Sequence, residues 1–325
     1  MRPAGHDLDL VLTAQPPLPP SRPTTSQDVF DGFGFIIGPT FLAAEFLSFI
    51  TRIVCFSQYI TKQHKAICPL KDLSPKFPES QWPIVQFCVT HYKEPVAETY
   101  PTLNNLIELD YPMDKLEINI LDDGYFNCKE GVYTPSKIGE EMTAMIRALV
   151  TRKSRGHGAE HMETEYEVES SRRPEAAPTG SRVIEFKHEA MPTVRQICRK
   201  RAKESHFKGG NLNNAVFNVL NEEKYQYYAF LDCDMAPTKD FLQLSMPAFF
   251  KCVDGRWVHN WEVAMTQAPQ CFHNLNETNG DDDPLFQQTD VYWRRTMQHL
   301  DHWGLVHYYG TNVVMFKPAL EDVVG

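Results

Sequence analysis

The pattern that most restricts the fold is a strand, a helix and a second strand in close succession near residue 100. Residues 83–90, PIVQFCVT, form a β-rich run, and residues 95–109 have apolar side chains at helical spacing. Residues 116–124, LEINILDDG, form a second β-rich run that ends in a turn. This succession is typical of a βαβ unit, in which the two strands are parallel. The sequence therefore predicts an α/β domain with an open, mostly parallel sheet.

The rest of this domain continues the same alternation after one interruption. Residues 129–180 begin with a helical pattern at 137–151 and then become polar and charged with no core period, so we expect a flexible surface insertion. A helix is expected to open around Asn211. Further strands are predicted at RVIEFKH (182–188), YQYYAFLDCD (225–234) and WEVAMTQAPQ (261–270).

Three segments precede the domain, which we place at 83–325. Residues 1–31 are Pro-rich without an apolar period and are expected to be a disordered tail, and residues 61–82 are expected to be a linker. Residues 32–60 are apolar except for Glu45 and Arg52 and are long enough to span a bilayer. They predict a transmembrane helix, with a buried or interfacial helix as the alternative.

Charge places this domain relative to the membrane and limits its partners. Lysines at 62, 65, 71 and 76 follow the apolar segment, so the positive-inside rule predicts that the domain faces the cytoplasm. The formal net charge of −10 argues against a general nucleic-acid-binding surface. The eight cysteines include no CxxC pair and are expected to be reduced thiols.

Acidic residues gather where three of the predicted strands end. The first strand ends in THYKEP (90–95), the second in DDG (122–124) and another in DCD (232–234). Ligands of open α/β sheets bind at the carboxyl ends of the strands. Asp232 and Asp234 suit a hard divalent cation that also holds substrate phosphates. The DDG segment taken alone also fits a simple turn.

A glycine-containing segment, HFKGGNLNNAVF (206–217), has the residues for binding a diphosphate. Lys208 supplies a positive charge, the two glycines allow close backbone approach, and a following helix offers free amides. The GxxxxGK(S/T) pattern of a Walker A loop is absent. A Gly-containing turn capped by asparagine is the alternative.

Taken in order, these motifs resemble family 2 glycosyltransferases of the cellulose-synthase-like, processive branch. The matching pieces are VTHYKEP, LDDG, HFKGGNLNNA, FLDCDMAP, VAMTQAPQCFHN and WGLVHYYGTNVVMFKPALEDVVG, with the apolar helix before them. Gly209 replaces the alanine of the family's KAGNLN segment. The resemblance implies a sheet of the nucleotide-diphospho-sugar transferase type.

The resemblance also implies a role for individual residues. Nucleotide contacts would come from Thr90, Tyr92, Glu94, Asp123 or its neighbour Asp122, Lys208 and Asp232, and Mg²⁺ or Mn²⁺ would be held by Asp234 with Asp232. The acceptor side would include Gln267, Pro269, Phe272, Gly310 and Thr311. The implied reaction is metal-dependent, inverting transfer of a hexose from a UDP-sugar, with UDP-glucose expected, to a growing β-glycan at the membrane.

Two motifs of the family do not occur among the 325 residues. These are the TED motif, whose aspartate is the family's general base, and QxxRW, which grips the acceptor glucan. We therefore expect the donor-binding half of a β-glycan synthase, with subunits of a synthase complex as partners and its catalytic base unassigned. A nucleotide-sugar-binding or regulatory module without activity, and a non-processive transferase, are the alternatives.

Overall fold

The computed structural model describes residues 37–53, 67–155, 161–169, 180–201, 206–271 and 292–324. The chain divides into two compact units, Met1–Thr61 and Lys62–Gly325, which are described separately. In the first unit, residues 37–53 are helical. Within the described ranges, no helix combines the length and the apolar character that crossing a membrane requires. The predicted tail at 1–31 lies outside the described residues.

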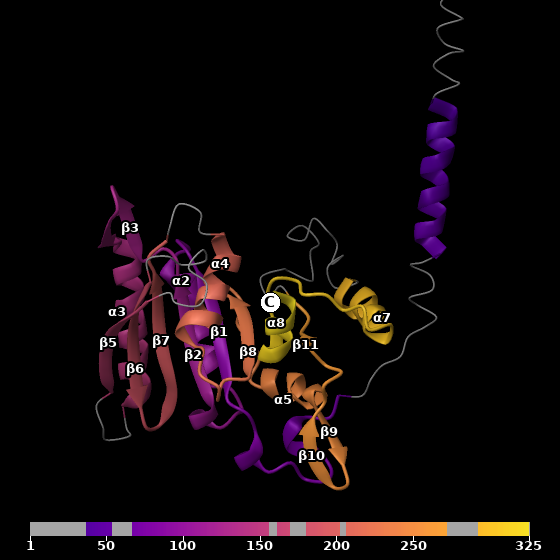
Figure 1. The fold of residues 1–325 in the computed structure, drawn as a ribbon. Coiled ribbons are helices and arrows are strands. Elements are labelled where there is room, and N and C mark those ends of the chain that lie inside the picture. The colour runs from indigo at the N-terminus through magenta and orange to yellow at the C-terminus, as the bar shows by residue number, and fades with distance from the viewer. Residues whose placement is uncertain are drawn as a thin grey trace, which may run out of the picture. The chain divides into compact units, whose positions relative to one another are not determined.

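An eight-stranded sheet forms the centre of the second unit, in the order β11-β12-β8-β1-β2-β7-β6-β5 (Figure 1). The pairs β1–β2, β1–β8 and β2–β7 are parallel, and the other neighbouring pairs are antiparallel. Because two successive antiparallel pairings restore the original direction, only β12 and β6 run against the other six strands. The prediction of a mostly parallel α/β sheet is confirmed.

The strands of this sheet are β1 (Val85–His91), β2 (Leu116–Asp122), β5 (Met162–Val168), β6 (Ser181–His188), β7 (Met191–Arg199), β8 (Tyr227–Asp232), β11 (Met265–Gln267) and β12 (Val313–Phe316). Two separate hairpins are β3–β4 (Phe126–Lys129 and Val132–Pro135) and β9–β10 (Phe250–Val253 and Arg256–His259). The α-helices in the described part of this unit are α2 (Val96–Ile107), α3 (Lys137–Ser154), α4 (Phe207–Asn214), α5 (Phe241–Ser245), α7 (Met297–His302) and α8 (Lys317–Val324).

The central strands are apolar on both faces, because each face of the sheet is covered. In β8, Tyr227, Ala229 and Leu231 join one core cluster together with residues of α2, α3 and α5. The alternate residues Tyr228 and Phe230 join a second cluster, which contains the turn that continues α4. Side chains alternate between the faces of a strand, so a strand between two helical layers is apolar throughout.

The interval 129–180, expected to be a flexible insertion, differs from that interpretation where the structure describes it. α3 lies within the interval, and its side chains Met142, Ile146 and Leu149 are buried in the core. β5 also lies within it and pairs along its length with β6. The apolar residues of α3 at helical spacing account for its packing, whereas the polar residues of β5 suit an edge strand.

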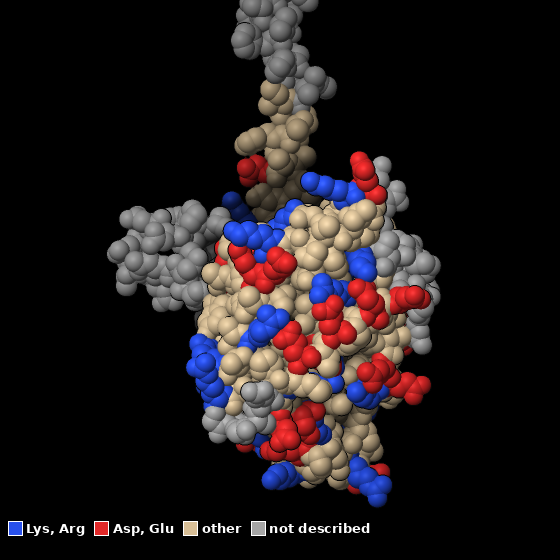
Figure 2. All heavy atoms as spheres, turned by 90° about the vertical axis from the view of Figure 1, so that its left-hand side faces the viewer, with Lys and Arg blue, Asp and Glu red and all other residues tan. Residues whose placement is uncertain are grey.

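The edge of the sheet at β5 carries charges of both signs. Figure 2 shows acidic and basic side chains interleaved on the face of the molecule nearest this strand. Glu163 of β5 pairs with Arg147 at 2.6 Å, Glu165 with Arg182 at 2.5 Å, and Glu167 with Lys200 at 2.7 Å. Such exposed pairs contribute little stability each, but charged side chains on an edge strand oppose pairing with other chains.

The predicted linker at 61–82 is folded from residue 67 onward. Leu70, Phe77 and Trp82 are buried and belong to the same core cluster as α2 and β1. The indole nitrogen of Trp82 donates to the carbonyl of Phe77 at 3.2 Å. The domain therefore begins earlier than residue 83, because these large apolar side chains are part of its core.

Candidate functional site

The parallel order of β8, β1 and β2 brings the three acidic strand ends to one edge of the sheet. In the register of these strands, Thr90 lies opposite Asp232 and His91 lies opposite Asp122. The segments THYKEP, LDDG and DCD are therefore neighbours in space, as the sequence predicts. Since β1 lies between the other two strands, its last residues contact both acidic ends.

Asp232, the last residue of β8, is the centre of a hydrogen-bonded group at this edge. Its carboxylate accepts from the ammonium of Lys208 and, at 3.0 Å, from the hydroxyl of Thr90. Its backbone N–H donates to the hydroxyl of Thr311 at 2.9 Å. The Lys208 ammonium also donates to the carbonyl of Gly310 at 2.6 Å. The side chains of Lys208 and Asp232 are each 37% exposed, so a ligand can reach both.

The loop before β12 owes its shape to Gly310 and Gln267. Gly310 has a φ of 92°, a left-handed conformation that glycine adopts without steric cost. The amide of Gln267 donates to the carbonyl of Thr311 at 2.8 Å, and its oxygen accepts from the N–H of Tyr309 at 3.2 Å. Gln267 thus connects β11 to this loop. Pro269 is exposed nearby in sequence, and Phe272 lies outside the described residues.

Asp122 is fully buried and its carboxylate is satisfied within the fold. One oxygen is 3.1 Å from His91 Nδ1 and accepts from the N–H of Gly124 at 2.9 Å. The other accepts from the amide of Gln196 at 2.9 Å. Burial lowers the pKa of His91, but the Asp122 carboxylate and the Glu94 carbonyl outweigh burial, so this pKa is raised. These contacts give Asp122 a structural role, and the nucleotide site proposed below does not include it.

Asp123 points toward two arginines that the sequence motifs did not include. Arg199, the last residue of β7, donates to both carboxylate oxygens of Asp123, at 2.8 and 2.5 Å, and Arg201 Nε lies 3.8 Å away. Burial raises the pKa of Asp123, and the two guanidinium groups oppose this. The Arg201 guanidinium also lies over the ring of Tyr92, 4.8 Å from its centroid. The sequence analysis predicted no strand where β7 lies, and the basic run Arg199-Lys200-Arg201 was the available sequence signal.

The loop after β1 is shaped by Glu94, whose carboxylate accepts from the N–H groups of Tyr92 and Lys93 at 2.7 and 3.1 Å. Burial raises the pKa of Glu94, but these backbone hydrogen bonds outweigh burial and the pKa is lowered. A Cβ on Gly124 would lie 1.3 Å from the carbonyl oxygen of Tyr92. The loops after β1 and β2 therefore touch, and Tyr92, 44% exposed, stands beside Asp123 and Arg201.

Asp234 differs from the other acidic residues because it is exposed and its carboxylate makes no hydrogen bond or ion pair in the described part of the chain. Among the described residues, no group of three or more His, Cys, Asp or Glu side chains is arranged to hold a metal ion. Two carboxylates one residue apart, one of them unpaired, are hard oxygen donors that fit Mg²⁺ or Mn²⁺ shared with substrate phosphates.

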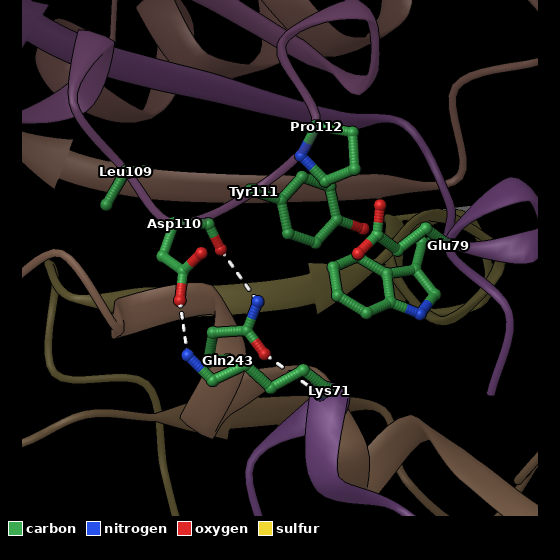
Figure 3. A pocket seen from close by; sticks show the side chains of 8 residues that line it. Lys71, Glu79, Leu109, Asp110, Tyr111, Pro112 and Gln243 are labelled. Atoms are coloured by element: carbon green, nitrogen blue, oxygen red, sulfur yellow. Dashed lines mark hydrogen bonds and ion pairs between the residues drawn. The ribbon is translucent and has the colours of Figure 1, made fainter. Parts of the chain in front are cut away.

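A cavity of about 290 Å³ lies elsewhere, near the starts of β1 and β2 (Figure 3). Its walls include Lys71, Trp82, Asp110, Tyr111 and Gln243. Lys71 and Asp110 form an ion pair at 2.7 Å, and the Gln243 side chain bonds to the backbone of both. This cavity is at the opposite ends of the strands from Asp232, so it is separate from the acidic residues at the carboxyl ends of β8, β1 and β2.

Comparison with known proteins relates the chain to cellulose synthases. It is 23% identical over 312 residues to the cellulose synthase catalytic subunit (UDP-forming) of Xanthomonas axonopodis pv. citri, covering 94% of this chain and 32% of the relative. The cellulose synthase 1 catalytic subunit of Komagataeibacter xylinus is 24% identical, over 89% of this chain and 29% of its own length. A cellulose synthase catalytic subunit of Dictyostelium discoideum is 29% identical over 134 residues, 41% of this chain and 12% of the relative.

Two other comparisons add little to this relationship. No protein-family profile matches the chain. Among solved structures, a mannosyltransferase from Pyrobaculum calidifontis in complex with GDP-Man and Mn²⁺ matches 72% of this chain and 47% of its own, with a TM-score of 0.36 and 16% identity. A similarity of this size supports no argument about ligands.

These relatives confirm the resemblance to cellulose-synthase-like glycosyltransferases that the ordered motifs indicated. The matches to the bacterial catalytic subunits cover 94% and 89% of this chain, so they include the three acidic strand ends between residues 90 and 234. The chain spans 12% to 32% of the length of the three relatives named above, so it corresponds to part of each of them. The chain is homologous to cellulose synthase catalytic subunits, and these relatives support its identification as a cellulose-synthase-like glycosyltransferase.

Proposed function

We propose that this chain binds a UDP-sugar, with UDP-glucose as the expected donor, and takes part in metal-dependent, inverting transfer of the hexose to a growing β-glycan. The observation that carries the proposal is the group at the carboxyl edge of the sheet, where Lys208, Thr90 and Thr311 all contact Asp232. The relatives named as UDP-forming support uridine diphosphate as the leaving group.

In this proposal, residues near Asp123 bind the nucleoside of the donor, and residues near Asp232 bind its diphosphate. Tyr92 and Glu94 would contact the uracil and ribose, since the Tyr92 ring is exposed beside Asp123. The ammonium of Lys208 would bind the diphosphate and balance the charge that develops on it as the hexose departs. A divalent cation held by Asp234 with Asp232 would supply Lewis-acid stabilisation of the same leaving group.

The acceptor would approach from the side of Gln267, Pro269, Phe272, Gly310 and Thr311. Attack by its hydroxyl on the face of the sugar opposite the diphosphate inverts the anomeric carbon. The hydroxyl proton must pass to a base, and we assign that role to none of the described residues.

The proposal is tested by titrating the purified chain with UDP, GDP and ADP, each with and without Mn²⁺. Tightest binding of UDP is expected, with affinity that depends on the metal. Asp234→Ala should weaken binding in Mn²⁺ by at least about tenfold, equivalent to about 1.4 kcal/mol, and should remove the metal dependence. Asp240→Ala, another exposed carboxylate of the same loop region, is the matched control and should bind as the wild type does.

Equal affinity for the three nucleotides, or UDP binding that ignores both the metal and Asp234→Ala, would count against the proposal. Binding that follows the expectation, measured together with transfer of labelled glucose from UDP-glucose, would separate an active synthase domain from a binding module.

We also propose that the apolar segment at 32–60 attaches the domain to the cytoplasmic face of a membrane. In its described part, Phe41, Leu42 and Phe46 are each more than 60% exposed. Exposed apolar side chains of this kind bind the hydrocarbon region of a bilayer. Replacing all three with serine should move the chain from the membrane fraction to the soluble fraction, and unchanged sedimentation would contradict this attachment.

A further inference from the structure

The side chain of Arg199 is completely buried and connects two parts of the candidate donor site. Its Nε donates to Asp123 Oδ1 at 2.8 Å, and one terminal nitrogen donates to Asp123 Oδ2 at 2.5 Å. The same terminal nitrogen donates to the backbone carbonyl of Phe207 at 3.2 Å. One guanidinium thus contacts the end of β2 and the start of α4.

The backbone at the start of α4 has an unusual conformation that needs support. His206 and Phe207 have φ values of 52° and 46°, in the left-handed region, which bulky side chains rarely adopt. Such residues cost energy and persist where surrounding contacts hold them. The Arg199 hydrogen bond to the Phe207 carbonyl is one such contact. The next residue is Lys208, whose ammonium contacts Asp232.

We propose that Arg199 is a positioning residue of the donor site, fixing Asp123 relative to the backbone that carries Lys208 before a donor binds. The inference rests on the proposed function, because it gives Arg199 a role in binding UDP. A planar guanidinium suits this role because it can bond both oxygens of a carboxylate and still reach a third acceptor. Lysine, a single flexible charge, cannot hold the same geometry.

A purely structural role for Arg199 makes a different prediction, and the chain provides a matched control. Arg195 lies four residues earlier on β7, is also buried, and pairs with Glu185 at 2.6 Å and with Glu117. Four residues of a strand span roughly 13 Å, so Arg195 lies well away from the carboxyl edge. Loss of Arg199 would remove both short hydrogen bonds from the buried Asp123 carboxylate, which would keep Arg201 at 3.8 Å. Loss of Arg195 would remove an ion-pair partner from Glu117 and from Glu185, so both substitutions should be destabilising.

The experiment measures UDP affinity in Mn²⁺ and the free energy of unfolding for the full chain and for Arg199→Gln and Arg195→Gln. Both variants should lose stability. Only Arg199→Gln should weaken UDP binding, by roughly 10- to 100-fold for the loss of a charged hydrogen-bond network. Arg199→Lys should bind UDP more weakly than the wild type and exchange the amide hydrogens of residues 207–210 faster, whereas Arg195→Gln should exchange them at the wild-type rate.

If Arg199→Gln does not fold, Arg199→Lys carries the test. UDP affinity at the wild-type level in the folded Arg199 variants would overturn the inference while leaving the proposed function in place. A wild-type chain that binds no UDP would overturn both.

Discussion

At the scale of single residues, Gly124 is the position where the loops after β1 and β2 come closest. Gly124→Ala should destabilise the fold by about 3 kcal/mol, because its Cβ would lie 1.3 Å from the backbone oxygen of Tyr92, which cannot move aside as a flexible side chain would. Chemical denaturation measures the change.

Gly209→Ala is the contrasting variant. Beyond the adjacent residues and the backbone of its own helix, no atom lies within 4 Å of a Cβ at this position, so alanine should stabilise α4 by about 0.5–1 kcal/mol. A Gly124→Ala variant as stable as the wild type would mean that the two loops do not touch.

His91 should make the stability of the domain depend on pH. Its pKa is raised above the ordinary value of about 6.5, chiefly because the Asp122 carboxylate outweighs the effect of burial. The imidazolium therefore stabilises the folded state, fully below about pH 6.5, and this stabilisation is lost as pH rises through the raised pKa.

The difference in free energy of unfolding between the wild type and His91→Gln isolates this effect from the other titrating groups. It should be largest near pH 6 and shrink toward pH 8. A difference that stays constant or grows over that interval would show that His91 is not favoured as a cation.

At the scale of elements, α3 is an integral part of the core. Ile146 is fully buried between α3 and the sheet, so Ile146→Ala should cost about 2–5 kcal/mol. Glu141→Ala changes an exposed residue of the same helix and should stay within about 0.5 kcal/mol of the wild type. Equal, small effects of both substitutions would restore the interpretation of 129–180 as an insertion.

The elements that the sequence predicted best are those with an unbroken apolar pattern. The runs that became β1, β2 and β8 contain buried side chains on both faces, which is a strong local signal. β5 has no such signal, because its glutamates at 163, 165 and 167 find their partners on α3, on β6 and just after β7, which lie near β5 only in the assembled fold. Its position at an edge is a property of the assembled sheet.

At the scale of the whole molecule, the strand order decides which residues share the site. Parallel strands ending in acid allowed the sequence to predict the meeting of Thr90, Asp123 and Asp232. Arg199 was not predictable in the same way, because it reaches Asp123 only if β7 lies beside β2. No local pattern specifies that neighbour. Asp122 and Asp123 likewise look equivalent in sequence, and only the fold separates their partners.

The central claim is that the donor binds at the carboxyl edge of the sheet, and hydrogen exchange with and without UDP and Mn²⁺ tests it most directly. With UDP and Mn²⁺ bound, the backbone amides should exchange more slowly in the loops at residues 90–95, 122–125, 206–211 and 232–235. The segments that line the cavity at the opposite ends of the strands, including residues 109–112, should exchange as before. Protection at 109–112 without protection at the carboxyl edge, or no protection at all, would contradict the account.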